Sequence, residues 1–447
     1  MTAPELLERL NSPKTAELFS SLYGETEIDA ARQRYRRLIN EFPEASGGNR
    51  GDFRGDHRGD LRLFSVPGRA ELGGNHTDHN RGKVLAASIQ LDAAAVVAPR
   101  RDKQVFFRSA GHRDIKVDLS DLAPREEEKG ETEALVRGIA AEFAARGTPV
   151  NGFTANAANA VLTGSGLSSS AAVEILFAKI FDNLYRGGET SALELAKIAQ
   201  KAENIYFGKP CGLMDQVACA SGGVIAIDFE DSMNPQVMEI AFDPAAVGFA
   251  LCVVNTKGSH SDLIPDYAAI PAEMKSIAAF FGKQVLRELD EKTFLAHIPE
   301  LRKAAGDRAV LRAIHFFSEN RRVDAMLTAL QSVNRSPNAM ETFLSLVRES
   351  GDSSWEFLQN IYSPRNPGEQ GLSIALAMTK KFLDGGSSSG ANNGACRVHG
   401  GGFAGTIQVF LPVERLEEYR ALMEGIFGKG ALTVLRIRSL GAVELHC

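Results

Sequence analysis

The sequence predicts an α+β fold, and three observations lead to this fold class. Short apolar stretches typical of buried strands lie at 61–72, 85–99 and 247–254. Helical patterning dominates from about 271 to 383, with a break at 363–371. Because strands and helices come in blocks, a segregated α+β arrangement fits better than a regular succession of βαβ units.

The composition is that of an ordinary globular protein, and it excludes several classes. Of the 447 residues, 44% are hydrophobic and 24% are charged, and this length predicts two or three domains. A net charge of −6 argues against a nucleic-acid partner. No apolar run reaches the roughly 18 residues of a membrane span, and the first residues lack a signal-peptide pattern. The five cysteines contain no CxxC pair, which favours a reducing, cytoplasmic setting.

The order of these patterns divides the chain into four parts. We expect an N-terminal helical extension at 1–48 and a solvated linker at 49–60, where Arg-Gly-Asp occurs three times. That tripeptide acts as an adhesion signal only on an extracellular loop, so we favour the linker. A first domain is expected at 61–235 and a second at 245–447, opened by the strand-like stretch VGFALCVV.

Helices in the first expected domain follow loops rich in glycine and serine. One helix is predicted near 131–146, and the apolar run 169–185 predicts another directly after a Gly/Ser turn. A capping box at 191–194 begins a third helix, which runs to about 204. A short fourth helix is expected within 212–223, where a glycine pair ends it.

The stretch PGRAELGGNHTDHN at 67–80 gathers hydrogen-bonding side chains in a loop between two predicted strands. His76, Asp78 and His79 could form a metal trio, but no HExxH or other ligand pattern accompanies them. A network that recognises the hydroxyl groups of a polar substrate agrees better with so many fixed donors and acceptors. We therefore predict a substrate-binding loop.

A second stretch, TGSGLSSSAA at 163–172, joins a glycine-containing turn to the start of a helix. Exposed amide groups and the dipole at a helix start favour a phosphate. The stretch is not a Walker A loop, and Ser169 replaces the third glycine of a dinucleotide fingerprint. Three serines that merely cap the helix are the alternative.

Two acidic residues follow this loop at positions that suit chemistry. Glu203 lies beside the apolar stripe of its predicted helix, and a carboxylate with a serine hydroxyl can hold Mg²⁺. Asp215 lies in the first turn of the short helix, where the dipole favours its ionised form. It can orient or deprotonate an attacking hydroxyl. For each acid, an ordinary solvent-facing or helix-start role is the alternative.

The last stretch is RVHGGGFAG at 397–405, which precedes an apolar strand. Three adjacent glycines indicate a backbone pressed close to a ligand or to another loop. A tight hairpin is the alternative explanation.

Together, the four stretches resemble the galactokinases, a family of the GHMP small-molecule kinases. The family pattern PGRVNLIGEHTDYNGG appears here as PGRAELGGNHTDHNRG, and GLSSSA appears as GLSSSAA. The pattern AEN…G-PCG-MDQ appears as AENIYFGKPCGLMDQ, and the RxTGGGFGG-like segment as RVHGGGFAG. The order and approximate spacing also match, so the resemblance covers about 67–405.

The resemblance implies a fold of two α+β domains with the active site in the cleft between them. It implies ATP-dependent, Mg²⁺-assisted phosphorylation of the anomeric C1 hydroxyl of a hexose, above all D-galactose. Asp215 would act as base or electrostatic partner, Arg69 would stabilise the developing charge, and Ser170 with Glu203 would hold Mg²⁺. The ATP phosphates would be bound by Gly164, Ser165, Gly166, Leu167, Ser168, Ser169 and Ser170. The sugar would be bound by Asn75, His76, Asp78, Gly212 and Tyr267.

Several positions depart from the family pattern. Asn75 stands where the family has Glu, and His79 stands where it has Tyr. Arg81 and Lys83 make the loop more positive than the family pattern, and His399 replaces a usual Thr. The sugar is then either galactose with a modified contact or an acidic sugar such as galacturonate. We favour galactose because His76, Asp78 and Asp215 are all kept.

Two other functions are alternatives to the kinase. A galactokinase-like sugar sensor that binds without turnover would show defects in the serine loop or at the catalytic Asp, whereas GLSSSAA and MDQ are intact. A metal-dependent hydrolase built on HTDH would carry stoichiometric zinc. The expected partners are therefore the sugar and ATP alone, with no nucleic acid and no membrane. The sequence does not determine the oligomeric state, and a monomer is compatible with it.

Overall fold

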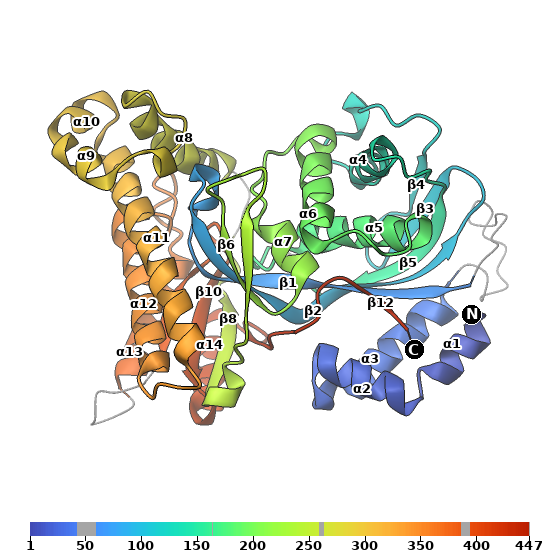
Figure 1. Cartoon of the computed structure of the whole chain (residues 1–447). Coiled ribbons are helices and arrows are strands. Elements are labelled where there is room, and N and C mark those ends of the chain that lie inside the picture. Colours follow the sequence, from blue (N-terminus) through green and yellow to red (C-terminus); the bar gives the residue numbers. More distant parts are fainter. Residues whose placement is uncertain (43–59, 163, 259–262, 386–393, 447) are drawn as a thin grey trace.

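The computed structural model describes residues 1–42, 60–162, 164–258, 263–385 and 394–446. The expected linker at 49–60 lies outside the described residues except for Asp60. Two β-sheets form the centre of the molecule, with helices on both sides of the larger sheet and against the smaller one (Figure 1). Among the described residues, no helix is long and apolar enough to cross a membrane.

Among the residues that the structure describes, the larger sheet has eight strands, and its long pair β1 and β2 carries the predicted sugar loop, residues 67–80. The strand order is β12-β1-β2-β5-β3-β4, and β6 pairs with β2 and with β7. The strands are β1 (Arg62–Gly73), β2 (Lys83–Pro99), β3 (Gln104–Ser109), β4 (Ile115–Asp118), β5 (Phe153–Asn159), β6 (Val224–Asp228), β7 (Gln236–Ile240) and β12 (Val443–Leu445). Register shifts interrupt the β1–β2 pairing between Pro67 and Arg69 and between Glu71 and Gly73. Such irregularities redirect side chains, here at the functional end of β1.

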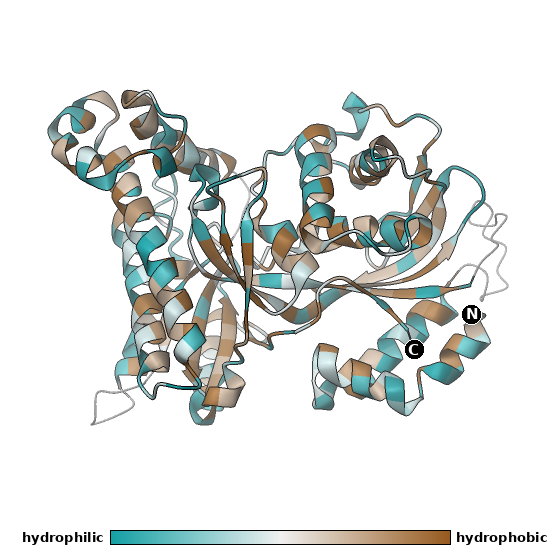
Figure 2. Cartoon of the chain, in the orientation of Figure 1, coloured by the Kyte–Doolittle hydropathy of each residue, from teal (hydrophilic) through white to brown (hydrophobic). Residues whose placement is uncertain are grey.

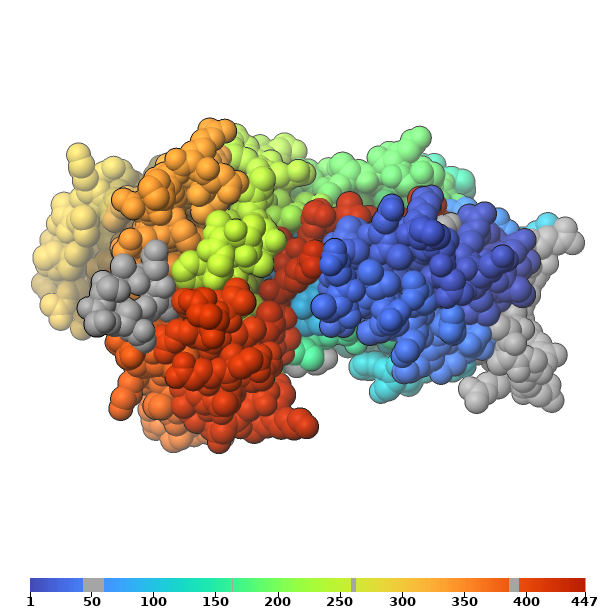
Figure 3. Space-filling model, turned by 90° about the horizontal axis from the view of Figure 1, so that it is seen from below, coloured from blue at the N-terminus to red at the C-terminus, as the bar shows by residue number. Residues whose placement is uncertain are grey.

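Helices cover both faces of this sheet. Figure 1 shows one group of helices above β1 and β2 and the N-terminal helices below them. The upper helices are α4 (Thr132–Ala145), α5 (Ser169–Tyr185), α6 (Ala192–Lys201) and α7 (Met214–Ser221). The lower ones are α1 (Ala3–Arg9), α2 (Pro13–Tyr23) and α3 (Ile28–Asn40), which are also exposed in the view from below (Figure 3). Apolar residues concentrate in the sheet strands between the two helical layers (Figure 2).

The smaller sheet has the order β11-β8-β10-β9 and belongs to the second half of the chain. Its strands are β8 (Phe249–Asn255), β9 (Ala395–His399), β10 (Thr406–Pro412) and β11 (Leu432–Leu435). The accompanying helices are α8 (Ile264–Phe280), α9 (Glu291–Ala296), α10 (Ile298–Ala304), α11 (Asp307–Ser332), α12 (Ala339–Ser353), α13 (Gly371–Asp384) and α14 (Leu416–Phe427). The antiparallel β9–β10 pair presents the glycine-rich turn at its end.

Most predicted elements coincide with observed ones, and two differ in an informative way. The third predicted helix ends at Lys201 and continues as a π-helical segment, η5 (Ala202–Phe207), so Glu203 lies in a widened turn. The final strand β12 returns to pair with β1 in the larger sheet. The second expected domain, 245–447, therefore contributes one strand to the sheet of the first.

Candidate active site

The four sequence stretches meet where the end of β1 faces the smaller sheet. The backbone N–H of Arg69 donates to the carbonyl of Leu167 in the Gly/Ser loop at 3.0 Å. On the other side, the side-chain amide of Asn75 donates to the Gly400 carbonyl at 2.8 Å. Residues that are hundreds of positions apart in sequence are thereby brought into one site.

Asp215 and Arg69 form the charged centre of this site. Nε of Arg69 donates to Oδ1 of Asp215 at 2.9 Å, and a second guanidinium nitrogen lies at 2.9 Å from the same oxygen. The other carboxylate oxygen, Oδ2, accepts from the Ser168 hydroxyl at 2.5 Å. The Arg69 side chain is buried, whereas the Asp215 side chain remains 35% exposed. The carboxylate is therefore held on one side and open on the other.

This environment keeps Asp215 ionised at neutral pH. Burial by itself would raise the pKa of Asp215, but the Arg69 guanidinium and the Ser168 hydroxyl outweigh this effect. The net pKa lies below its usual value. An ionised carboxylate with a free edge can attract the proton of a hydroxyl group that approaches it.

The Gly/Ser loop has an alternating backbone that leads into α5. Gly164, Gly166 and Ser168 all have positive φ, of 71°, 69° and 59°. Alternation of left-handed and ordinary conformations makes successive N–H groups point into one concavity, which suits an anion. Of the following serines, Ser169 accepts from the Asn159 amide at 2.8 Å, and Ser170 is exposed. Leu167 is buried and anchors the loop.

Glu203 lies in a buried acidic pocket beside Asp215. The amide of Gln216 donates to Glu203 at 2.9 Å and to Glu174 at 3.0 Å, and Lys209 donates to Glu203 at 3.1 Å. Burial and the neighbouring Glu203 raise the pKa of Glu174 to about 8. In the part of the chain that the structure describes, Oε1 of Glu174 and Oε1 of Gln216 are buried without a hydrogen-bond partner.

These oxygens give the pocket the chemistry that a hard cation requires. Mg²⁺ binds one or two protein oxygens and completes its shell with phosphates and water. Glu203 and the exposed hydroxyl of Ser170 are oxygen ligands of that kind, and the unpartnered side-chain oxygens of Glu174 and Gln216 lie beside Glu203. Lys209 is 62% exposed, so its ammonium can leave Glu203 when a metal competes. The donor set therefore fits Mg²⁺.

The Asn75 side chain is buried, and its polar atoms bond to other residues of the protein. Its side-chain amide group donates to Glu71 at 2.9 Å and to the Gly400 carbonyl at 2.8 Å, and its side-chain oxygen accepts from Asn360 at 2.8 Å. The residue is 1% exposed. Because these contacts use both amide protons, a ligand hydroxyl finds no donor left on Asn75. Its predicted contact with the sugar stays a prediction, and the geometry favours a supporting role.

His76 and Asp78 are positioned more openly. Nε2 of His76 lies at 2.9 Å from the Gly401 carbonyl, and burial lowers the pKa of His76 to about 3. The neutral ring therefore donates through Nε2, and Nδ1 is an acceptor that suits a hydroxyl group. A Cβ at Gly212 would lie 1.9 Å from a carboxylate oxygen of Asp78, so a larger residue at 212 would displace the Asp78 carboxylate. Gly212 and Asp78 therefore lie in direct contact.

Tyr267 contacts the glycine-rich turn from α8. Its hydroxyl donates to the Gly402 carbonyl at 3.0 Å, and its ring would be 2.6 Å from a Cβ at Gly401. Burial raises the pKa of Tyr267 to about 12, so the hydroxyl remains protonated. The structure therefore brings Tyr267 to the same turn that His76 contacts, and its contact with a sugar stays a prediction.

The extra positive charges of the loop are paired with acids outside the site. Arg81 lies at 3.1 Å from Glu288, and Lys83 lies at 2.8 Å from Asp324 and 3.6 Å from Asp228. The sequence difference therefore adds little free positive charge for a ligand.

A transition-metal site on the HTDH segment finds no support among the described residues. No group of three His, Cys, Asp or Glu side chains there is arranged to hold a metal ion. Nε2 of His79 lies 3.7 Å from Asp78, whereas His76 turns to Gly401.

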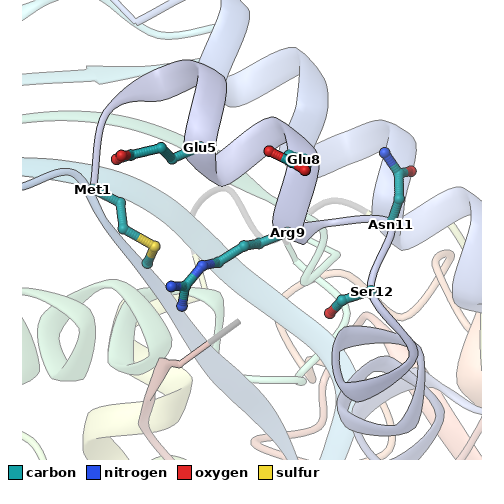
Figure 4. Close-up of a pocket in the computed structure, with 6 residues that line it drawn as sticks. All are labelled: Met1, Glu5, Glu8, Arg9, Asn11 and Ser12. Carbon is teal, nitrogen blue, oxygen red and sulfur yellow. The ribbon is translucent and has the colours of Figure 1, made fainter.

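A separate pocket of about 570 Å³ lies on the N-terminal helices, far along the chain from these stretches (Figure 4). It is lined by Met1, Glu5, Glu8, Arg9, Asn11 and Ser12. It contains none of the motif residues, so it is not the candidate site.

Sequence reasoning missed several residues that organise the site. Arg397 is fully buried and donates to Glu71 at 2.5 Å, and Glu319 of α11 accepts from the Gly74 N–H at 3.0 Å. Glu174 had a detectable signal, since an acid stands inside the apolar run AAVEILF. Glu319 had none, because its contact spans 245 positions.

Comparison with known proteins agrees with this geometry. The family description "GHMP kinases N terminal domain" matches residues 134–223, and "Galactokinase galactose-binding signature" matches residues 52–99. A galactokinase of Streptomyces coelicolor is 29% identical over 93% of this chain and 96% of its own. One of Glaesserella parasuis is 29% identical over 80% of this chain and 87% of its own.

Solved structures show the same fold. The crystal structure of Lactococcus lactis galactokinase complexed with galactose matches with a TM-score of 0.73 at 22% identity, covering 94% of this chain and all of the other. Methanococcus jannaschii mevalonate kinase matches with a TM-score of 0.57 at 13% identity, over 85% of this chain and 99% of the other. The chain thus contains a GHMP kinase N-terminal domain and a galactokinase galactose-binding signature, and it is similar to galactokinases over most of its length.

Proposed function

We propose that the protein transfers the γ-phosphoryl group of ATP to the C1 hydroxyl of a hexose, with D-galactose as substrate. The observation that carries this proposal is the Asp215 carboxylate, which is ionised, half-open and held between Arg69 and the Ser168 hydroxyl of the phosphate loop. Phosphoryl transfer depends mainly on positioning and on charge neutralisation, and this arrangement serves both needs.

The residues divide the work as follows. The sugar C1 oxygen forms a bond to the γ-phosphorus while the bond from phosphorus to the β,γ-bridging oxygen breaks and ADP leaves. Asp215 attracts the proton of the C1 hydroxyl, as base or as electrostatic partner. Arg69 faces the same region and stabilises negative charge that develops there. The N–H groups of residues 164–170 and the start of α5 bind the phosphates.

Mg²⁺ would be held by Ser170 and Glu203, whose oxygens suit it. When bound, it supplies positive charge to the phosphates of ATP. Glu174 and Gln216 would stabilise the placement of Glu203 from behind.

A neutral hexose fits this site better than an acidic one. Arg81 and Lys83 are paired with acids, so neither offers a free cation to the carboxylate of galacturonate. Galacturonate would therefore lose hydration without gaining a partner among these residues.

The test is ADP release by the purified protein with ATP, Mg²⁺ and a panel of galactose, galacturonate, N-acetylgalactosamine, glucose and arabinose. We expect clear preference for galactose. Preference for galacturonate would overturn the substrate assignment. Absence of turnover with every sugar, despite tight ATP binding, would identify a sensor instead of an enzyme.

A further inference from the structure

His399, the last residue of β9, links three of the four motif stretches through both ring nitrogens. Its Nε2 accepts from the backbone N–H of Glu71 at 3.1 Å, and its Nδ1 lies 3.1 Å from the hydroxyl of Thr406. Because Nε2 accepts, the ring proton is on Nδ1 and is donated to Thr406. The Thr406 hydroxyl then donates to the carbonyl of Ser165 in the phosphate loop at 2.6 Å.

This chain of hydrogen bonds is shielded from water along its whole length. His399 is 1% exposed, and Thr406 and Ser165 are fully buried. A Cβ at Gly166 would lie 3.2 Å from Nδ1 of His399, so the loop backbone rests directly on the ring. Hydrogen bonds in such surroundings are electrostatically stronger than in water, and each lost partner leaves a costly unsatisfied group.

Thr406 and Arg69 together hold three consecutive carbonyls of the phosphate loop. Thr406 holds that of Ser165, the Arg69 guanidinium that of Gly166, and the Arg69 N–H that of Leu167. In a trans peptide the C=O and the next N–H point in opposite directions. The N–H groups of residues 166, 167 and 168 therefore point away from the scaffold, which is the orientation that a bound phosphate requires.

We propose that His399 is a positioning residue of the nucleotide site: through Thr406 it fixes the Ser165 carbonyl and so aims the Gly166 N–H at a phosphate. This inference rests on the proposed function, since it takes residues 164–170 as the phosphate loop. Burial lowers the pKa of His399 to about 3, which keeps the ring neutral and its hydrogen-bond pattern constant at physiological pH. His399 stands where the galactokinase pattern has Thr.

The test compares His399→Leu, which removes both contacts, with His399→Gln, which has an acceptor and a donor on one planar group. The readouts are the Kd for ADP by calorimetry and the KM for ATP and for galactose. We expect His399→Leu to raise both the Kd for ADP and the KM for ATP by about tenfold. This is the effect of losing one hydrogen bond to a charged phosphate group. His399→Gln should recover most of this loss, and the KM for galactose should change less than twofold.

Thr406→Val cuts the same chain at its middle and nearly keeps the side-chain shape. It should raise the Kd for ADP as much as His399→Leu does. The Kd of the double variant should be no higher than that of either single variant. Thr406→Val also carries the test if His399→Leu does not fold. Additive losses of ADP affinity in the double variant would contradict a role of His399 that acts through Thr406.

His315 provides a matched control on α11. It is also fully buried and also uses both ring nitrogens, at 2.9 Å from Ser353 and 2.9 Å from the Asn75 carbonyl. It supports the sugar loop, so His315→Leu should raise the KM for galactose and leave ADP binding unchanged. Unchanged ADP binding in His399→Leu, or equal loss of both ligands in the two histidine variants, would overturn the inference. If the wild-type protein itself neither binds ADP nor phosphorylates a sugar, the proposed function fails instead.

Discussion

Two arginine–carboxylate clusters lie on opposite faces of the larger sheet, and they differ in how far the carboxylate is exposed. Below the sheet, Asp92 is completely buried, with Arg34 at 2.7 Å, Arg438 at 3.5 Å and the Tyr23 hydroxyl at 2.8 Å. Above it, Asp215 has one arginine and one serine, and its side chain is 35% exposed. Asp92 is enclosed by its partners, whereas Asp215 keeps an open edge.

The comparison separates a structural carboxylate from one available for chemistry. Asp92 joins the N-terminal helices to β2 and to the C-terminal segment, since Arg34 comes from α3 and Arg438 precedes β12. An enclosed ion pair of this kind is costly to break, because the remaining charges stay buried. A carboxylate that is ionised and reachable can meet a substrate. Exposure, more than charge, distinguishes the two clusters.

The largest expected effect is on the open cluster. Asp215→Asn should lower turnover by roughly a hundredfold or more, because a neutral amide neither accepts the hydroxyl proton nor balances Arg69. The Kd for ADP should change little, and steady-state kinetics with calorimetry would measure both quantities. Turnover near that of the wild-type protein would show that Asp215 has been given the wrong role.

Breaking the enclosed cluster at Asp92 should instead lower stability and leave turnover nearly unchanged. Asp92→Asn should lower the free energy of unfolding by about 3–5 kcal/mol, since two arginines lose a buried counter-charge. Urea denaturation measures this change, and kcat of the folded fraction should stay within about twofold. Asp114→Asn, which breaks the exposed pair with Arg108 at 2.9 Å, is the control and should cost at most about 1 kcal/mol. Equal costs for the two variants would remove the distinction.

The substitution Asn75→Glu tests whether the buried surroundings of Asn75 accept the carboxylate of the family pattern. Asn75→Glu would place a second acid against Glu71 and the Gly400 carbonyl, both of which accept hydrogen bonds at this point. We expect a rise in the KM for galactose and a loss of about 1–3 kcal/mol in stability. Glu71→Asn combined with Asn75→Glu should recover part of both losses. Tighter galactose binding by Asn75→Glu alone would instead show that residue 75 is a direct sugar contact.

The buried carboxylate of Glu319 should make the stability of the protein depend on pH. Burial would raise the pKa of Glu319, but His315, Arg322 and Arg397 outweigh it and bring the pKa to about 2. A depressed pKa contributes stability above the unfolded value of 4.5, and that stability is lost as the pH falls toward 2. The difference in unfolding free energy between the wild-type protein and Glu319→Gln should be constant near pH 7 and shrink below pH 4.5. Growth of that difference on acidification would contradict the assignment.

Local patterns predicted much of the fold. The apolar run 169–185 coincides with α5, and 131–146 with α4, because a helical period is set by near neighbours. The π-helical turn at Glu203 was not predicted, since an apolar stripe does not distinguish its wider hydrogen bonding from an ordinary helix. The role of Glu203 stays a prediction, and the sequence did not predict the residues that surround it.

The site required contacts that no local pattern contains. The Ser168–Asp215 hydrogen bond spans 47 positions, and the Asn75–Gly400 bond spans 325. The family resemblance brought these stretches together in advance, because it carries the fold with it. It also suggested an unusually positive loop, and only the structure shows the acids of the second half of the chain that offset Arg81 and Lys83.

The smallest expected effect comes from that paired surface charge. Lys83 is 23% exposed and bonds Asp324, whose side chain is 55% exposed, so Lys83→Ala should cost no more than about 1 kcal/mol of stability. If Lys83 served an acidic substrate, its loss would selectively reduce turnover of galacturonate. We expect instead that the KM for galactose stays within about twofold and that the ratio of kcat/KM for the two sugars is unchanged, because the ammonium is directed at Asp324 and Asp228. A shift of that ratio toward galactose would show that the charge acts on the substrate.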